Sequence, residues 1–201
     1  MMTEQQLEAD RTAEEQAWAI AATVCDPEIP VLTVEDLGIL RSVRLSDDVR
    51  LFDDGGSGPS AGGDALQGAD DGGNRPAVEV TITPTYSGCP AMDAIKDDLV
   101  TVFKQAGYPK VTVRLVLSPA WTTDWMTDAG KAKLAEYGIA PPTGRSAAGG
   151  HSGPVRLSLM VKCPQCSSLN TKELTRFGST SCKALYVCQD CKEPFDYFKV
   201  L

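Results

Sequence analysis

Histidine is almost absent from this chain of 201 residues, which contains a single one, His151. This excludes most forms of histidine-based acid–base catalysis. The sequence also lacks GxGxxG, P-loop and GxSxG motifs, and therefore the phosphate-binding loops and nucleophile turn of several large enzyme families. No pair of carboxylates stands out among its 27 acidic residues. We therefore expect no enzymatic activity from this chain alone.

Long apolar runs and an export signal are also missing. No stretch approaches the roughly 18 consecutive apolar residues that a membrane-spanning helix requires. The N-terminal sequence MMTEQQLEAD is acidic and polar, whereas a secretory signal begins with basic residues followed by an apolar segment. These two absences predict a cytoplasmic protein that does not contact membranes.

Positive charge is scarce over most of the chain, whose formal net charge is −8. Residues 1–52 contain 11 acidic and 4 basic groups, and residues 53–75 contain 5 and 1. Nucleic acid binding depends on concentrated positive charge, so we expect a protein partner and no nucleic acid. Residues 155–201, with 4 acidic and 7 basic groups, leave a nucleic-acid-binding ribbon as a weaker hypothesis. Salt-sensitive binding would reveal it.

Apolar periodicity predicts an α+β domain over residues 10–138, with helices on one face of a small sheet. The expected helices are Thr12–Val24, Pro90–Ala106 and one within Trp121–Tyr137 that is capped by Thr127 or Asp128. The expected strands are Ile39–Phe52, Ala77–Thr83 and Val111–Leu117.

Two segments have compositions that favour disorder. Residues 53–76 are rich in glycine and aspartate, and we expect an exposed, disordered insertion between the two strands of a hairpin. A long insertion is tolerated there because the entropy of loop closure grows only logarithmically with length. Residues 139–155 are predicted to be a flexible linker, with a separate small unit over residues 156–201.

That small unit contains two CxxC pairs separated by 21 residues, formed by Cys163 with Cys166 and by Cys188 with Cys191. Each pair lets a tight turn present two thiolates, and two such turns complete a closed tetrahedral site. The spacing predicts a four-cysteine zinc ribbon whose folding depends on its metal. Mononuclear iron or an iron–sulfur cluster remains open, since four thiolates suit those as well.

Three cysteines lie outside these pairs. Cys182 is either a small buried hydrophobic residue or a ligand or nucleophile, and a coordination set that includes it remains open. Cys25 is expected to be structural. Cys89 precedes Pro90 at the predicted start of a helix, where the helix dipole tends to lower the pKa of a thiol. Cys89 is thus either a ligand or nucleophile, or a passive capping or buried residue.

Two parts of the sequence resemble known families. The stretch DPEIPVLTVEDLGIL (Asp26–Leu40), the segment TPTYSGCP (Thr83–Pro90) and the following helix resemble the metal–sulfur cluster assembly domain of SufT-like proteins. That resemblance covers about residues 12–120. The segment FGST-x-CKALYxCxxCxEPFDYFK (Phe177–Lys199) resembles the C-terminal ribbon of PaaD-like proteins, which are encoded with the bacterial phenylacetyl-CoA epoxidase.

The resemblance implies a helper role in aerobic phenylacetate degradation, in the maturation or maintenance of epoxidase metal centres. The client would be the di-iron oxygenase or its iron–sulfur reductase. The resemblance also makes Cys89 the functional thiol, which would transiently hold iron or a cluster, with Asp26 and Glu28 in the same site. The competing hypothesis is a non-catalytic adaptor subunit of the epoxidase complex. The insertion at 53–76 departs from the family pattern.

Overall fold

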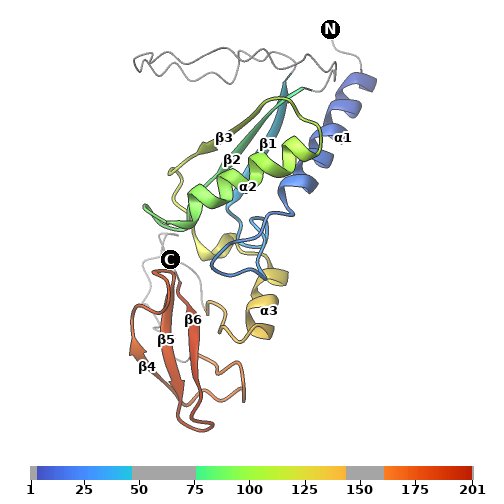
Figure 1. Ribbon diagram of the computed structural model, residues 1–201. Coiled ribbons are helices and arrows are strands. Elements are labelled where there is room, and N and C mark those ends of the chain that lie inside the picture. The colour runs from blue at the N-terminus through green and yellow to red at the C-terminus, as the bar shows by residue number, and fades with distance from the viewer. Residues whose placement is uncertain (1–3, 47–75, 144–160, 201) are drawn as a thin grey trace, which may run out of the picture.

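The computed structural model describes residues 4–46, 76–143 and 161–200 (Figure 1). Nearly all of the predicted insertion and His151 lie outside these ranges. The elements in chain order are α1 Glu4–Ala21, β1 Leu40–Ser46, β2 Ala77–Ile82, α2 Ala91–Gln105, β3 Val111–Leu115, the short 3-10 helix η2 Thr123–Trp125, α3 Asp128–Glu136, β4 Thr171–Thr175, β5 Lys183–Cys188 and β6 Pro194–Phe198. They form two three-stranded sheets, which confirms the predicted α+β class. No helix within the described ranges is long and apolar enough to cross a membrane.

The first sheet has the strand order β1-β2-β3, with β1 antiparallel and β3 parallel to β2. The antiparallel pair confirms the predicted hairpin. α2 connects the two parallel strands, and α1 and α2 contact the sheet and each other. The central strand β2 has three fully buried side chains, Val78, Val80 and Ile82. They share one core with the apolar stripe of α2, which includes Ile95 and Leu99.

The helix α1 ends at Ala21, before the predicted end at Val24. The hydroxyl of Thr23 donates a hydrogen bond to the carbonyl of Ile20 (2.7 Å). Such local side-chain bonds offer the backbone an alternative to the helix. The chain then turns, and an isolated bridge pairs Cys25 with Thr33.

Asp36 anchors α3 to the segment that precedes β1. Its carboxylate accepts hydrogen bonds from the backbone N–H of Thr33 (3.1 Å), the hydroxyl of Thr127 (3.2 Å) and the ammonium of Lys133. Thr127 caps α3 by accepting from the N–H of Gly130 (2.9 Å), which confirms one of the two predicted caps. Burial alone would raise the pKa of Asp36, but the bonds from Lys133 and Thr33 outweigh it and lower that pKa.

We expect Asp36→Asn to lower the free energy of unfolding by about 1–3 kcal/mol at neutral pH, because the amide has one acceptor oxygen instead of two and no charge to pair with Lys133. The Asp36 carboxylate has a folded-state pKa below its unfolded value. Its contribution is therefore complete above the unfolded pKa and disappears as the pH falls through the folded pKa. Denaturant unfolding at several pH values measures this, with the exposed Asp97→Asn as control. A constant difference down to strongly acidic pH would contradict the assignment.

The second sheet has the order β4-β5-β6, with both pairs antiparallel. β4 was not predicted, because its side chains are mostly exposed and show no apolar alternation. Tyr186 contacts the rings of Phe195 and Tyr197, with centroids 5.9 and 5.5 Å away. These residues belong to a small core of their own. We refer to residues 161–200 as the ribbon.

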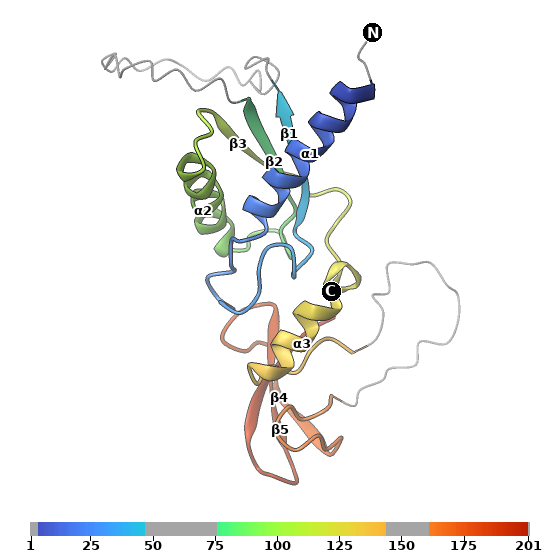
Figure 2. The ribbon, with the colours of Figure 1, turned by 90° about the vertical axis from the view of Figure 1, so that its right-hand side faces the viewer.

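The ribbon is packed directly on the rest of the molecule, with α3 beside it (Figure 2). Ala140 is paired with Tyr197 through two backbone hydrogen bonds: Ala140 donates to the carbonyl of Asp196 (2.8 Å), and Phe198 donates to the carbonyl of Ala140 (2.9 Å). The ring of Phe198 lies against Trp121, with centroids 6.2 Å apart. Phe198 belongs to the core of the first sheet. The predicted domain limits stay a prediction, but the beginning of the 139–155 range is bonded to β6.

Candidate metal centre and thiol site

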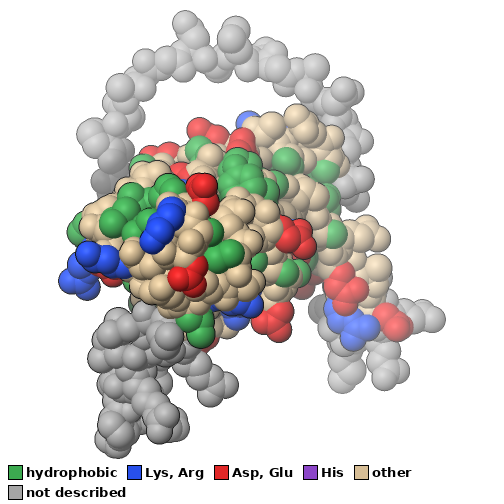
Figure 3. All heavy atoms as spheres, turned by 90° about the horizontal axis from the view of Figure 1, so that it is seen from below, with side chains coloured by type: hydrophobic (Ala, Val, Ile, Leu, Met, Phe, Trp, Pro, Cys, Tyr) green, Lys and Arg blue, Asp and Glu red, His purple; other side chains and the backbone are tan. Residues whose placement is uncertain are grey.

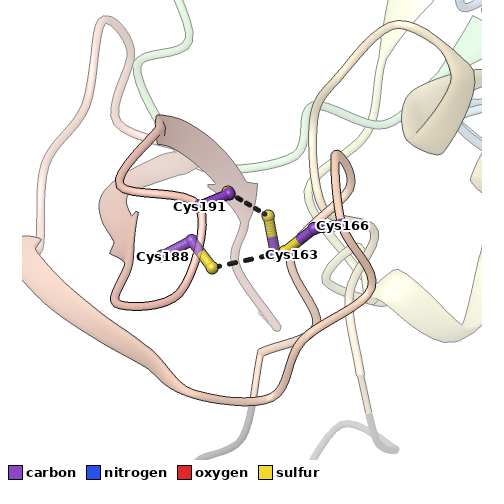
Figure 4. A group of neighbouring side chains, drawn as sticks. All are labelled: Cys163, Cys166, Cys188 and Cys191. Atoms are coloured by element: carbon purple, nitrogen blue, oxygen red, sulfur yellow. Dashed lines mark hydrogen bonds between the residues drawn. The ribbon is translucent and has the colours of Figure 1, made fainter.

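Four cysteine sulfurs of the ribbon converge between two turns (Figure 4). Cys163 and Cys166 come from the turn before β4, while Cys188 ends β5 and Cys191 lies in the turn before β6. All four Sγ atoms lie within 4.8 Å of one another. The distances are 3.8 Å from Cys163 to Cys191 and 3.5 Å from Cys166 to Cys188. Metal–sulfur bonds of about 2.3 Å in a tetrahedron place the sulfurs about 3.8 Å apart, so this donor set fits zinc.

The two turns have the same local construction. Each contains a left-handed residue four positions after its first cysteine: Ser167 with φ 64° and Lys192 with φ 65°. The N–H of each left-handed residue donates to the carbonyl of that first cysteine, at 2.9 and 3.0 Å. Non-glycine residues adopt this conformation at a cost on the order of 1 kcal/mol, so the surrounding structure must hold them there.

A polar bridge joins the two turns. Asp190, inside the second CxxC pair, accepts hydrogen bonds from the hydroxyl of Ser168 and from the side-chain amide of Asn170 (2.8 Å). Ser168 in turn accepts a bond from the backbone N–H of Asn170 (3.0 Å). Partners of this kind orient the ligands of metal sites. The bridge therefore fixes the relative position of the two cysteine pairs.

The backbone also favours the thiolate form, which is the form that binds metals. The N–H groups of Cys191 and Asp190 are directed at the sulfur of Cys188 and lower its pKa to about 7. At Cys191 the backbone N–H of Glu193 also lowers the pKa, but burial and the neighbouring cysteine sulfurs outweigh it and raise that pKa to about 12. Within the described ranges, these four cysteines form the single cluster of three or more potential metal ligands at this spacing. Cys182 lies outside it, so the structure supports the two CxxC pairs rather than a coordination set that includes Cys182.

A second group of reactive side chains belongs with the start of α2, where the charges of Glu28 and Asp26 act on Cys89. Asp26 is buried, and its Oδ1 accepts from the N–H groups of Glu28 (2.7 Å) and Ile29 (2.8 Å). These two hydrogen bonds close the turn, so Asp26 has a structural role. Burial raises the pKa of Glu28, and the nearby Asp26 raises it further, while Lys183 lowers it.

Cys89 is half-buried, one residue before the N-cap of α2. The N–H of Ala91 is directed at its sulfur, as expected at a helix start, but the pKa of the thiol is raised rather than lowered. Burial is the largest cause, and the negative charges of Glu28 and Asp26 add to it. The sequence predicted that Cys89 lies at the start of a helix, but it did not predict that burial would desolvate the thiol. Gly88 has φ +97° and open space where a Cβ would lie, so the chain is uncovered immediately before the thiol.

Nothing in the sequence predicted that residues of the ribbon pack against the core that also contacts Cys89. Cys182 is buried in the same core against which Cys89 packs, and its sulfur lies 3.0 Å from the hydroxyl of Thr180. Tyr86 connects the two parts. Burial raises its pKa, a hydrogen bond with Ser181 of the ribbon opposes this, and the thiols of Cys89 and Cys182 both act on it. In the sequence, the one sign that Cys182 lies elsewhere is that it belongs to neither CxxC pair.

Comparison with known proteins agrees with the description of the ribbon. The model of the PaaD zinc beta ribbon domain matches residues 150–199. Over 186 residues the chain is 41% identical to an Escherichia coli (strain K12) protein that is named as a putative subunit of 1,2-phenylacetyl-CoA epoxidase, with 92% of each chain covered. This chain belongs to the PaaD family.

Two further similarities each cover less than two thirds of this PaaD-family chain. It is 31% identical over 122 residues to a Porphyromonas gingivalis (strain ATCC BAA-308 / W83) protein named "Fe-S protein maturation auxiliary factor", covering 60% of this chain and 90% of that protein. A crystal structure of a DUF59 domain from Bacillus anthracis aligns with a TM-score of 0.46 and 20% identity, covering 64% of this chain and 96% of that one.

Proposed function

We propose that this chain is an accessory factor that assists assembly or repair of a metal centre in the phenylacetyl-CoA epoxidase system of aerobic phenylacetate degradation. The half-buried Cys89 thiol just before α2, on which the charges of Glu28 and Asp26 act, carries the proposal. The names of two relatives support it, since one is called an epoxidase subunit and the other an Fe-S maturation factor. The client is the di-iron oxygenase or its iron–sulfur reductase, and the protein acts in the cytoplasm.

In this proposal the four cysteines of the ribbon hold zinc. Cys163, Cys166, Cys188 and Cys191 fill all four positions of a tetrahedral ion, so the ion is structural rather than catalytic. The small core of the ribbon makes the ion a large part of its folding energy.

Cys89 is the residue that takes the cargo, which is iron or an iron–sulfur cluster. Its thiol is protonated at neutral pH because its pKa is raised, and it must lose that proton when it binds a metal. Glu28 is the nearby group that can accept the proton, since burial and Asp26 bring its pKa closer to neutrality. The raised thiol pKa weakens binding, which suits a site that releases what it carries.

Replacing Cys89 with serine tests this role. Produced together with the epoxidase subunits, Cys89→Ser is expected to lower the iron content and activity of the purified epoxidase on the order of tenfold, because the cargo loses its sulfur ligand. Cys25→Ser is the control: it removes an exposed thiol that neighbours Asp26. Wild-type iron content and activity with Cys89→Ser, at equal expression, would remove the thiol from the mechanism.

An adaptor without chemistry is the second candidate, and the surface of the ribbon favours it. Its large exposed hydrophobic side chains are Leu169, Leu174 and Phe177, with exposed fractions of 48%, 54% and 67%. Figure 3 views this end of the molecule and shows hydrophobic side chains at the surface among charged ones. Contiguous apolar surface marks protein contacts, and an adaptor would use these side chains as such a surface. An adaptor requires that Leu174→Ser with Phe177→Ser abolishes capture of the epoxidase while Cys89→Ser has no effect on its iron content.

A further inference from the structure

We propose that the groove between α1 and β1 binds an extended acidic segment of a partner protein, which adds a strand to the outer edge of the first sheet. The groove is open and has a volume of about 540 Å³. It shares no lining residue with the four-cysteine cluster, and neither Cys89 nor the carboxylates that act on it line it. The proposal therefore goes beyond the proposed function and depends neither on cargo nor on metal.

The helix side of the groove is one face of α1. Its residues are three or four positions apart, so they lie on the same side of the helix: Arg11, Glu14, Glu15 and Trp18. Trp18 is fixed in place, because its indole N–H donates to the carboxylate of Glu35 (2.8 Å) and its ring packs against the first core. Figure 1 shows α1 beyond β1, at the opposite end of the sheet from β3, and α1 lies in front of β1 in Figure 2.

The other side of the groove is the edge of β1. It consists of consecutive residues: Arg41, Ser42, Val43 and Arg44. Successive side chains of a strand point to opposite faces of a sheet, so a groove that contacts all of them runs along the strand edge rather than over one face. β1 is the last strand in the order of this sheet, and no strand in the described ranges pairs with its outer edge. Backbone groups on such an edge can pair with another extended segment.

A β-bulge positions Arg41 beside this edge. Leu40 and Ser42 oppose consecutive residues of β2, so Arg41 between them has no opposite residue. Bulges of this kind redirect a side chain. The guanidinium carbon of Arg41 lies 3.7 Å from the centre of the Trp125 ring. A guanidinium that is stacked in this way still offers the N–H groups at its rim to a carboxylate.

The charges along β1 favour an acidic partner. Residues 1–52 contain 4 basic groups, and three of them line the groove: Arg11, Arg41 and Arg44. On the helix side Arg11 is paired with Glu15 (3.6 Å). On the strand side, no carboxylate of the described residues forms an ion pair with Arg41 or Arg44. The strand side is therefore the positive side, in a chain whose net charge is −8.

The alternation of β1 defines the expected sequence of the partner segment. Val43 is buried on the face that packs against the helices, whereas Arg44 is exposed on the opposite face. An added strand continues these two faces. Its side chains should thus be apolar toward Trp18 and acidic toward Arg44, in alternation. Positive charge on the edge also disfavours pairing with a second copy of the same edge, so the occupant is a different chain.

A short synthetic peptide in which glutamate alternates with valine tests the proposal. Full-length wild-type protein is expected to bind it, as measured by fluorescence polarisation of a labelled peptide. Arg44→Glu should weaken this binding on the order of tenfold or more, because like charges would face each other. A peptide with lysine in place of glutamate should show the reverse preference and bind Arg44→Glu more tightly than wild type.

Arg176→Glu is the matched control, since it makes the same charge change at an exposed arginine of the ribbon and should bind the glutamate peptide as wild type does. Circular dichroism verifies that both variants are folded, and Arg44→Gln provides a milder change in the same direction. Equal binding by folded Arg44→Glu and Arg176→Glu would overturn the proposal. Cys89→Ser should bind normally, which keeps this result apart from the proposed function.

Strand addition is tested separately from charge. Hydrogen exchange should show new protection of the backbone amides of β1 when the glutamate peptide binds, while β3, the other edge of the sheet, stays unchanged. A version of the peptide with N-methylated backbone amides cannot donate to β1 and should bind at least tenfold more weakly, on the order of a lost strand pairing. Protection at β3 instead of β1, or equal binding of the N-methylated peptide, would overturn the proposal.

Discussion

Cys188→Ser is expected to unfold the ribbon, which is the largest effect of any substitution considered for this chain. Cys188 is fully buried and belongs both to the set of four cysteine ligands and to the small core of the ribbon. Metal binding contributes about 10–16 kcal/mol of apparent free energy in small zinc domains, and little else stabilises this sheet. Backbone hydrogen exchange should show loss of protection across β4, β5 and β6, together with loss of bound zinc.

The control for this experiment is Cys182→Ser, which should retain zinc because that sulfur lies outside the metal cluster. A chelator applied to wild-type protein should reproduce the loss of protection. Native protection of β5 in metal-free Cys188→Ser would contradict the view that metal holds the ribbon together.

Phe198→Ala is expected to lower the free energy of unfolding by about 3–5 kcal/mol, the usual cost of removing a buried aromatic ring. Phe198 is 1% exposed, and its ring contacts Trp121 across the contact between the ribbon and the first sheet. The cavity would open where the two parts meet, so the ribbon should also separate more readily. Denaturant unfolding measures the stability, and limited proteolysis measures the separation.

Phe177→Ala is the matched control, because it removes the same ring from a position that is 67% exposed. Surface substitutions of this kind usually change stability by less than about 0.5 kcal/mol. Equal effects of the two substitutions would show that Phe198 does not join the ribbon to the first core.

Local patterns in the sequence predicted much of this structure. The helix α2 has a strong apolar stripe with Ile95, Leu99 and Phe103 on its buried face, so its limits were predicted to within one residue at each end. The two CxxC pairs were sufficient to predict the metal cluster, because a tight turn fixes the position of each pair. In both cases nearby residues determine the outcome.

The missed features depend on residues that are distant in the sequence. The exposed β4 forms because β5 offers it an edge, and its own residues show no strand pattern. The raised pKa of Cys89 comes from burial and from the charges of Glu28 and Asp26, which belong to another segment. The residues next to Cys89 in the sequence do not predict this. Cys182 reaches the first core through the packing of Phe198 and the pairing of Ala140 with Tyr197. Composition predicted a flexible tether near Ala140, yet this residue is held by two backbone bonds.

The pairing of Ala140 with β6 also sets an order of events during protein synthesis. A ribosome makes Asp26, Glu28 and Cys89 early, and these residues can fold with the first sheet while translation continues. Cys182 and Phe198 are made later and can join that core only once the ribbon has been synthesised. A newly made chain whose ribbon has not folded would leave Trp121 without its contact to Phe198, so completion of the first core would report that the ribbon is in place.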